Sequence, residues 1–130
     1  MGQDINAIFR NAAVEFAGKV RASLGDQIDS IVLYGSTARG EARSDSDVDI
    51  LVISRDADIT RGKLSEIRAD FTYERSYAFF LSLAHFGREE FHRLRELGSP
   101  FFGEVVREGE VLYDNGTFSG IRAGSARVSG

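Results

Sequence analysis

The sequence predicts an α/β (α+β) fold, with a small mixed β-sheet and helices packed mainly on one side of it. Residues 31–34 and 48–53 form short runs rich in Ile and Val, with the length and composition of strands rather than core helices. Segments with helical spacing of apolar residues lie before and after these runs. The loop between the two runs is too short for a parallel crossover, so we expect them to pair antiparallel.

The helices are predicted from the spacing of apolar residues and from capping residues. Apolar side chains after Asp4 recur every three or four positions, and Asp is a preferred N-terminal cap. Ser99 precedes Pro100, which places a cap before a proline at the first helical position. The segment 88–97 alternates in charge sign, as a solvated helix face does. The predicted helices cover residues 5–24, 60–75, 88–97 and 99–109.

Two further strands and a tail complete the predicted chain. Residues 77–83 form a third apolar run, whose aromatic side chains we assign to the core, and residues 111–113 form a shorter strand. From position 115 onward the chain is rich in Gly, Ser and Arg without apolar periodicity. We therefore predict one domain over residues 1–114 and a flexible tail over residues 115–130.

Composition excludes several classes of function. The chain has 130 residues, 42% hydrophobic and 28% charged, which suits one globular core. The net charge of -4 argues against generic nucleic-acid binding. The chain has no cysteine, so neither disulfides nor thiolate metal sites are possible. No apolar run approaches the roughly 18 residues of a membrane span, and the first residues lack a signal-peptide pattern. We therefore expect a cytoplasmic protein without a membrane partner.

The loop after the first strand has the features of a phosphate-binding site. Gly35 allows the backbone to turn tightly, and Ser36 adds a hydroxyl and an N–H group at the start of about one helical turn, residues 36–40. Exposed backbone N–H groups of this kind bind phosphate oxygens. Arg39 and Arg43 can reach the same place, and arginine binds phosphate through a bidentate fork.

Two carboxylates open the second strand. Asp47 and Asp49 are two positions apart, so on a strand they project from the same face at roughly 7 Å along the backbone, whereas Val48 projects from the other. Neighbouring carboxylates repel unless a cation neutralises them. Mg²⁺ takes one or two carboxylates and completes its shell with water and substrate phosphate. The loop therefore matches a nucleoside triphosphate bound with Mg²⁺.

Other polar residues near the loop have competing interpretations. Arg39 can bind the triphosphate or pair with Glu41, and the sequence favours neither. Asp45 is better explained as a turn residue, because Asp bonds locally to the backbone. His85 and His92 lack metal-site spacing and are expected at the surface.

The pattern Gly-Ser, ten residues, Asp-x-Asp resembles the signature of the DNA polymerase β-like nucleotidyltransferase superfamily. The string YGSTARGEARSDSDVDILV is similar to the minimal nucleotidyltransferase branch, which includes MntA-like antitoxins often encoded beside a helical HEPN-domain partner. The segment FFGEVVREGEVLYD is similar to the end of such domains. The resemblance covers about residues 27–114.

The resemblance implies roles for the signature residues. Gly35 and Ser36 would hold the triphosphate of ATP or another NTP, and Asp47 and Asp49 would hold two Mg²⁺ ions for in-line attack of a hydroxyl on the α-phosphorus. It also implies a third carboxylate on a neighbouring strand. The run 77–83 contains no acidic residue, so the sequence departs from the family pattern there.

Three functions fit these observations. The first is a Mg²⁺-dependent nucleotidyltransferase that moves a nucleoside monophosphate, AMP above all, to a hydroxyl on a HEPN-type partner as the antitoxin of a pair. The second is a nucleotide- or partner-binding module in which the missing carboxylate has weakened catalysis. The third is an aminoglycoside-type enzyme acting on a small molecule, which would need a helical domain that the sequence lacks.

Overall fold

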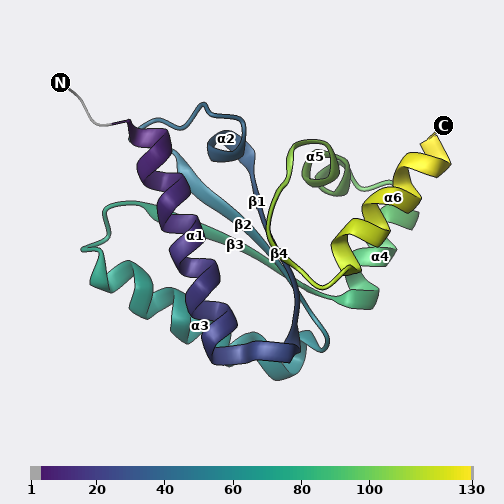
Figure 1. Cartoon of the computed structure of the whole chain (residues 1–130), viewed down its shortest axis with the longest axis horizontal. Helices are drawn as coiled ribbons and strands as arrows, with labels where there is room; N and C mark the ends of the chain where they lie inside the picture. The colour runs from purple at the N-terminus through teal and green to yellow at the C-terminus, as the bar shows by residue number, and fades with distance from the viewer. Residues whose placement is uncertain (1–3, 130) are drawn as a thin grey trace.

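The computed structural model describes residues 4–129 and forms a four-stranded sheet with helices on both faces (Figure 1). The elements are α1 (Ile5–Leu24), a 3₁₀ turn (Gly25–Gln27), β1 (Ile28–Tyr34), α2 (Gly35–Ala38), β2 (Asp47–Ser54), α3 (Ala57–Glu74), β3 (Phe80–Gly87), α4 (Arg88–Glu96), α5 (Pro100–Glu108), β4 (Glu110–Asp114) and α6 (Thr117–Ser129). The strand order is β3-β2-β1-β4. β1 pairs antiparallel with β2 and β4, and β2 pairs parallel with β3. The predicted mixed α/β sheet is confirmed.

The helices lie on both faces of the sheet, whereas the sequence predicts that they pack mainly on one side. Ile31 and Leu33 of β1 pack with α1 and α3, whereas Val32 of β1 and Leu51 of β2 pack with α4, α5 and α6. Every residue of β1 is buried. An unbroken apolar run, rather than an alternating one, is typical of a strand covered on both faces. In Figure 1, α1 and α3 lie on one side of the strands and α4 to α6 lie on the other.

The third strand begins three residues later than predicted. Residues 77–79 belong to the turn between α3 and β3, because Ser76 and Tyr77 have left-handed φ angles of 54° and 56°. Of the aromatic residues assigned to the core, Phe79 is half-buried and packs 5.6 Å from the Phe9 ring. Tyr77 and Phe80 are instead exposed. That part of the prediction is wrong, because Tyr77 lies in the turn and Phe80, the first residue of the edge strand β3, is also exposed to solvent.

The predicted flexible tail is also corrected within the described residues, since helix α6 packs onto the sheet. Phe118 is fully buried beside α4 and α5. Asp114 accepts hydrogen bonds from the backbone N–H groups of Phe118 and Ser119, both at 3.1 Å. Burial disfavours the ionised form of Asp114, but hydrogen bonds from Ser119, Ser30 and Phe118 outweigh it and lower the pKa. Capping and burial therefore stabilise a helix that its Gly- and Ser-rich composition disfavours.

His85 is half-buried rather than at the surface. Its Nε2 atom lies 2.7 Å from the Ser54 hydroxyl and 3.1 Å from the Thr60 hydroxyl, which joins β2, β3 and α3. Burial and the charge of Arg61 lower the His85 pKa, although Glu90 opposes them. This network satisfies polar groups at the end of the sheet away from the signature loop. No helix within residues 4–129 has the length and apolar content needed to cross a membrane.

Candidate active site

The signature loop brings its glycine against its second aspartate. Gly35 follows β1 with a φ of 74°, a left-handed conformation that glycine adopts without steric penalty. A Cβ atom added to Gly35 would lie 3.0 Å from the Cγ atom of Asp49 and would collide with its Oδ2 atom. The loop therefore requires glycine at position 35 for two reasons: the left-handed backbone angle and the space that Asp49 occupies.

The sheet register fixes the surroundings of both carboxylates. Asp49 pairs with Tyr34 on β1 and with Ser82 on β3, and Asp47 pairs with Phe80. Val48, between the two aspartates, packs in the core beside α1 and α3. Because side chains alternate along a strand, Asp47 and Asp49 project from the opposite face, the one on which α5 lies. Asp47 is exposed and Asp49 is half-buried.

The charges around Asp49 disfavour its ionised form. Burial, followed by the negative charges of Asp47 and Glu104, raises the pKa of Asp49 to about 6. A hydrogen bond from Ser82 and the charge of Arg39 act in the opposite direction. The pKa of Tyr34 also rises, to about 12, through burial and the charges of Asp49 and Glu104. A bound cation would relieve this concentration of negative charge.

Glu104 is the acidic residue near the site that the sequence interpretation missed. It lies on α5 between Phe101, whose ring packs edge-on 5.5 Å from the Tyr34 ring, and Glu108, which binds Arg39 at 2.8 Å. Residues three and four apart share a helix face, so Glu104 also faces β1 and the signature loop. The spacing of Phe101, Glu104 and Glu108 shows that they share one face of the predicted helix. The sequence did not show that this face would turn toward the signature loop.

The residues present fit a cation held by two carboxylates. Strand β3 carries no acidic residue, and Ser82 occupies the position beside Asp49. Among residues 4–129, no three Asp, Glu or His side chains are close enough together to hold one metal ion. Two carboxylate ligands with the remaining positions open to water and phosphate is nevertheless the arrangement in which Mg²⁺ is commonly bound.

The two arginines of the loop differ in their contacts. Arg39 forms ion pairs with Glu41 at 3.2 Å and with Glu108 at 2.8 Å, so the structure shows the pairing that the sequence left open. Arg43 is exposed, and no ion pair joins it to a described residue. Its backbone N–H donates to the Ser46 hydroxyl at 2.8 Å, which shapes the turn before Asp47. Arg43 is the arginine of the loop that is available to an anionic ligand.

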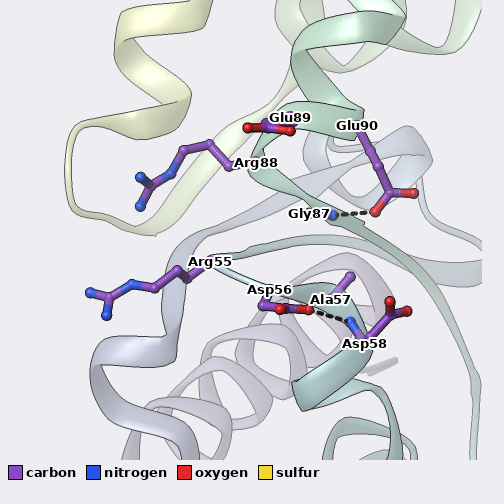
Figure 2. Close-up of a pocket in the computed structure, with 8 residues that line it drawn as sticks. All are labelled: Arg55, Asp56, Ala57, Asp58, Gly87, Arg88, Glu89 and Glu90. Atoms are coloured by element: carbon purple, nitrogen blue, oxygen red, sulfur yellow. Dashed lines mark hydrogen bonds between the residues drawn. The ribbon is translucent and has the colours of Figure 1, made fainter.

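Two cavities lie at opposite ends of the parallel strand pair. One, of about 500 Å³, borders Asp47 and the starts of β2 and β3. The other, of about 370 Å³, lies between the first turns of α3 and α4 and contains no signature residue. Figure 2 shows its two arginines and four acidic residues, with Glu90 accepting from the Gly87 N–H at 2.9 Å. Its Arg88 is held by the buried carboxylate of Asp29. We therefore assign the chemistry to the end with Asp47.

Comparison with proteins of known sequence agrees with this geometry. Two proteins of Methanocaldococcus jannaschii, both provisionally named protein adenylyltransferases, are similar to the chain. MJ1305 is 28% identical over 111 residues, 85% of this chain and 76% of that protein. MJ0141 is 31% identical over 68 residues, 52% of this chain and 69% of that protein.

Solved structures share the fold at low sequence identity. A toxin–antitoxin complex with AMP-PNP contains a chain of 17% identity and TM-score 0.57, matched over 89% of this chain and 86% of that one. A complex of tri-AMPylated Shewanella oneidensis HEPN toxin with its MNT antitoxin gives 16% identity and TM-score 0.56, over 93% and 86%. A family model described as the nucleotidyltransferase domain matches residues 15–92, which include the Gly-Ser loop and both aspartates. Because that match spans more than half of the sequence, the chain belongs to the nucleotidyltransferase domain family of enzymes.

Proposed function

We propose that this protein is a Mg²⁺-dependent adenylyltransferase that moves AMP from ATP to a hydroxyl group on a partner protein. The observation that carries the proposal is the contact between Gly35 and Asp49, which brings a phosphate-binding turn directly beside a pair of carboxylates. ATP as donor and protein as acceptor are supported by the names of the two Methanocaldococcus jannaschii relatives. A cytoplasmic location remains a prediction.

Different residues of the loop would bind different parts of the Mg²⁺–ATP complex. The Ser36 hydroxyl and the backbone N–H groups after Gly35 would bind phosphate oxygens, and Arg43 would add a positive charge. Arg39 is already paired with two carboxylates, so we give it the lesser role of holding α5 against the loop. Asp47 and Asp49 would hold Mg²⁺, which would neutralise the phosphate charge during transfer.

The transfer would exchange one P–O bond for another. The acceptor oxygen attacks the α-phosphorus of ATP, and the bond to the departing pyrophosphate breaks as the new bond forms. Ser82 is a poor base at neutral pH, so the hydroxyl proton would pass to water rather than to β3. Asp49 would be ionised at neutral pH, because even its raised pKa is about 6.

The partner we propose is a HEPN-domain protein, with this chain as the antitoxin of the pair. Two observations support it. The MNT antitoxin that shares the fold occurs in a complex with a tri-AMPylated HEPN toxin. The described residues of this chain also fold around one sheet, so no second domain within them could hold an acceptor.

The test is transfer of label from [α-³²P]ATP to a HEPN-domain protein encoded beside this chain, with Mg²⁺ present. We expect label on the partner with the wild-type protein and at least about a thousandfold less with Asp47→Asn, because that variant loses a metal ligand. Asp45→Asn is the matched control, since Asp45 lies in the same loop and is expected to retain transfer. Equal labelling by the Asp47→Asn variant would contradict the proposal.

A second function is favoured by one observation, the serine at position 82. If catalysis needs a carboxylate on β3, the chain would bind nucleotide and partner without transferring AMP. Inhibition of the HEPN protein that survives Asp47→Asn, with no label on that protein, would select this binding function over the adenylyltransferase.

A further inference from the structure

We infer that Asn6 of α1 is a positioning residue for the nucleotide-binding loop, by which we mean residues 35–46 between β1 and β2. Its side-chain amide holds the loop in the shape that presents Ser36 to the phosphates of ATP. Asn6 lies outside residues 15–92, the part of the chain that the family model matches. The inference rests on the proposed function, because it concerns how the loop of that site keeps its shape.

The Asn6 side chain bridges two points of the nucleotide-binding loop. Its Nδ2 atom donates to the carbonyl oxygen of Thr37 at 3.2 Å, and its Oδ1 atom accepts from the backbone N–H of Ala42 at 2.9 Å. An asparagine amide carries both a donor and an acceptor group, so one side chain can make both bonds at once. In Figure 1 the loop that follows α2 runs beside the first turn of α1. Asn6 therefore fixes both ends of the segment 37–42.

The backbone of the loop does not supply the second of these bonds by itself. Two backbone hydrogen bonds shape the chain after Gly35, from Arg39 to Gly35 at 3.1 Å and from Glu41 to Ser36 at 2.9 Å. Among residues 4–129, no backbone carbonyl accepts from the N–H group of the half-buried Ala42, whose hydrogen bond goes to Asn6. A backbone polar group that loses its partner away from water is costly. Without the Asn6 amide, the loop must therefore change shape or admit water.

Helix α1 has no need of asparagine at position 6. The backbone N–H of Asn6 donates to Oδ1 of the Asp4 cap at 3.0 Å, a bond that any residue except proline can make. Alanine has a higher helix propensity than asparagine, so helix formation alone favours alanine at this position. Asn6→Ala should therefore strengthen α1 as a helix while it removes both contacts with the loop. Any loss of nucleotide binding in that variant comes from the loop.

Asn6 holds the loop from the face of the sheet opposite to the carboxylates. Helix α1 packs with α3 on one face, whereas Asp47 and Asp49 project from the other. On that other face, Arg39 binds Glu108 of α5 at 2.8 Å. The loop is thus attached to α1 on one side and to α5 on the other. A loop that is ordered before ATP arrives loses less conformational entropy on binding, which raises its affinity.

The first experiment measures nucleotide affinity by isothermal titration calorimetry with Mg²⁺ and α,β-methylene ATP, which cannot transfer AMP. We expect Asn6→Ala to weaken binding by about tenfold, because binding must then order the loop. Asn11→Ala is the matched control, since it is the same substitution at an exposed position of the same helix. Equal affinity of the wild-type protein and both variants would overturn the inference.

Amide hydrogen exchange separates positioning of the loop from general support of the fold. In Asn6→Ala we expect the Ala42 amide to exchange at least about tenfold faster, while the amides of β1 keep their wild-type rates. If instead the amides of β1 and of the loop all exchange faster by the same factor, and nucleotide affinity is unchanged, Asn6 supports the fold alone and the inference is overturned. Urea denaturation of the same samples checks that both variants are folded.

Transfer of label from [α-³²P]ATP to the HEPN-domain protein distinguishes failure of this inference from failure of the proposed function. A KM for ATP raised about tenfold by Asn6→Ala, with kcat within about twofold of wild type, supports both. Equal KM values for the two proteins would refute the role of Asn6 and leave the adenylyltransferase intact. Weaker binding of α,β-methylene ATP by Asn6→Ala, with no label transferred even by the wild-type protein, would refute the adenylyltransferase and support the role of Asn6 alone.

Discussion

The two ends of the parallel pair β2–β3 differ in whether the carboxylates near them have hydrogen-bonded partners of opposite charge. At the end where α3 and α4 begin, the buried carboxylate of Asp29 accepts two hydrogen bonds from Arg88, at 2.8 and 3.0 Å, and one from Asn115 at 2.8 Å. At the other end, Asp47 and Asp49 lie together, and neither forms an ion pair with a described Arg or Lys, although the charge of Arg39 acts on Asp49. One end is electrostatically satisfied and stabilises the fold. The other keeps a charge imbalance that a ligand can correct.

The largest expected loss of stability comes from removing the Asp29 carboxylate, whose hydrogen-bond partners are Arg88 and Asn115. Asp29→Ala leaves Arg88 and Asn115 without their shared partner, and we expect the free energy of unfolding to fall by about 3 kcal/mol. Urea denaturation measures the change. Asp58→Ala is the control, since it removes an exposed i,i+3 pair with Arg61 and should cost less than about 0.5 kcal/mol. Equal losses in the two variants would show that the Asp29 network contributes no more than a surface pair.

The next largest expected loss of stability comes from disturbing the contact between Gly35 and Asp49. Gly35→Ala combines a left-handed backbone with a collision against Asp49, and we expect a loss of roughly 2 kcal/mol together with weaker nucleotide binding. Gly40→Ala is a matched control, because Gly40 has a similar φ of 77° but nothing within 4 Å of an added Cβ. The difference between the two variants in urea denaturation isolates the contact with Asp49. If the two variants lose equal stability and bind nucleotide equally well, that contact has no role.

A smaller expected effect is a dependence of stability on pH, caused by the raised pKa of Asp49. The pKa of Asp49 rises from 3.8 to about 6 on folding, so the folded state binds more protons between these values. Stability therefore falls as pH rises from about 4 to 6, and the penalty is fully present above that range. After allowance for solvent screening of a half-buried group, Asp49→Asn should stabilise the metal-free protein by about 1 kcal/mol at pH 8 and little at pH 4. Denaturation at both pH values checks this, and stabilisation equal at pH 4 and 8 would refute it.

The smallest expected effect concerns the carboxylate on α5. Glu104→Gln removes one of the charges that raise the pKa of Asp49, so that pKa should move down toward its ordinary value. A ¹³C-detected NMR titration of the Asp49 carboxyl measures it. Glu108→Gln is the comparison, since Glu108 is paired with Arg39 and is not among the charges that act on Asp49. A larger shift from Glu108→Gln would reverse our assignment of which acid faces the site.

The signature end was largely predictable because its information is local. Gly35, Ser36 and the two aspartates lie within one loop and the strands that flank it, so strand periodicity alone placed both carboxylates on one face. The contribution of Glu104 was not predictable, because it depends on how a helix some 55 residues further along packs on the sheet. The helical spacing was visible, but its orientation is a property of tertiary structure.

The parts of the fold that were missed share this dependence on distant contacts. Helix α6 has a composition typical of a disordered tail, yet the burial of Phe118 and the Asp114 cap stabilise it. The start of β3 was misplaced because Tyr77 and Phe79 have high strand propensity, whereas the left-handed turn at Ser76 and Tyr77 leaves no sequence signal without a glycine. The continuous apolar run at residues 31–34 of β1 did indicate two covered faces, and the prediction of helices mainly on one side overlooked it.

The absence of a side chain at Gly35 sets how closely Asp49 of β2 can approach the end of β1. Glycine places only a hydrogen atom there, so the Asp49 carboxylate can lie directly against the backbone while it accepts a hydrogen bond from Ser82. Close packing against Gly35, together with that hydrogen bond, sets the distance between the turn after β1 and the Asp49 carboxylate. A site packed in this way keeps its shape before any ligand arrives, and a side chain larger than that of glycine at position 35 would displace the Asp49 carboxylate.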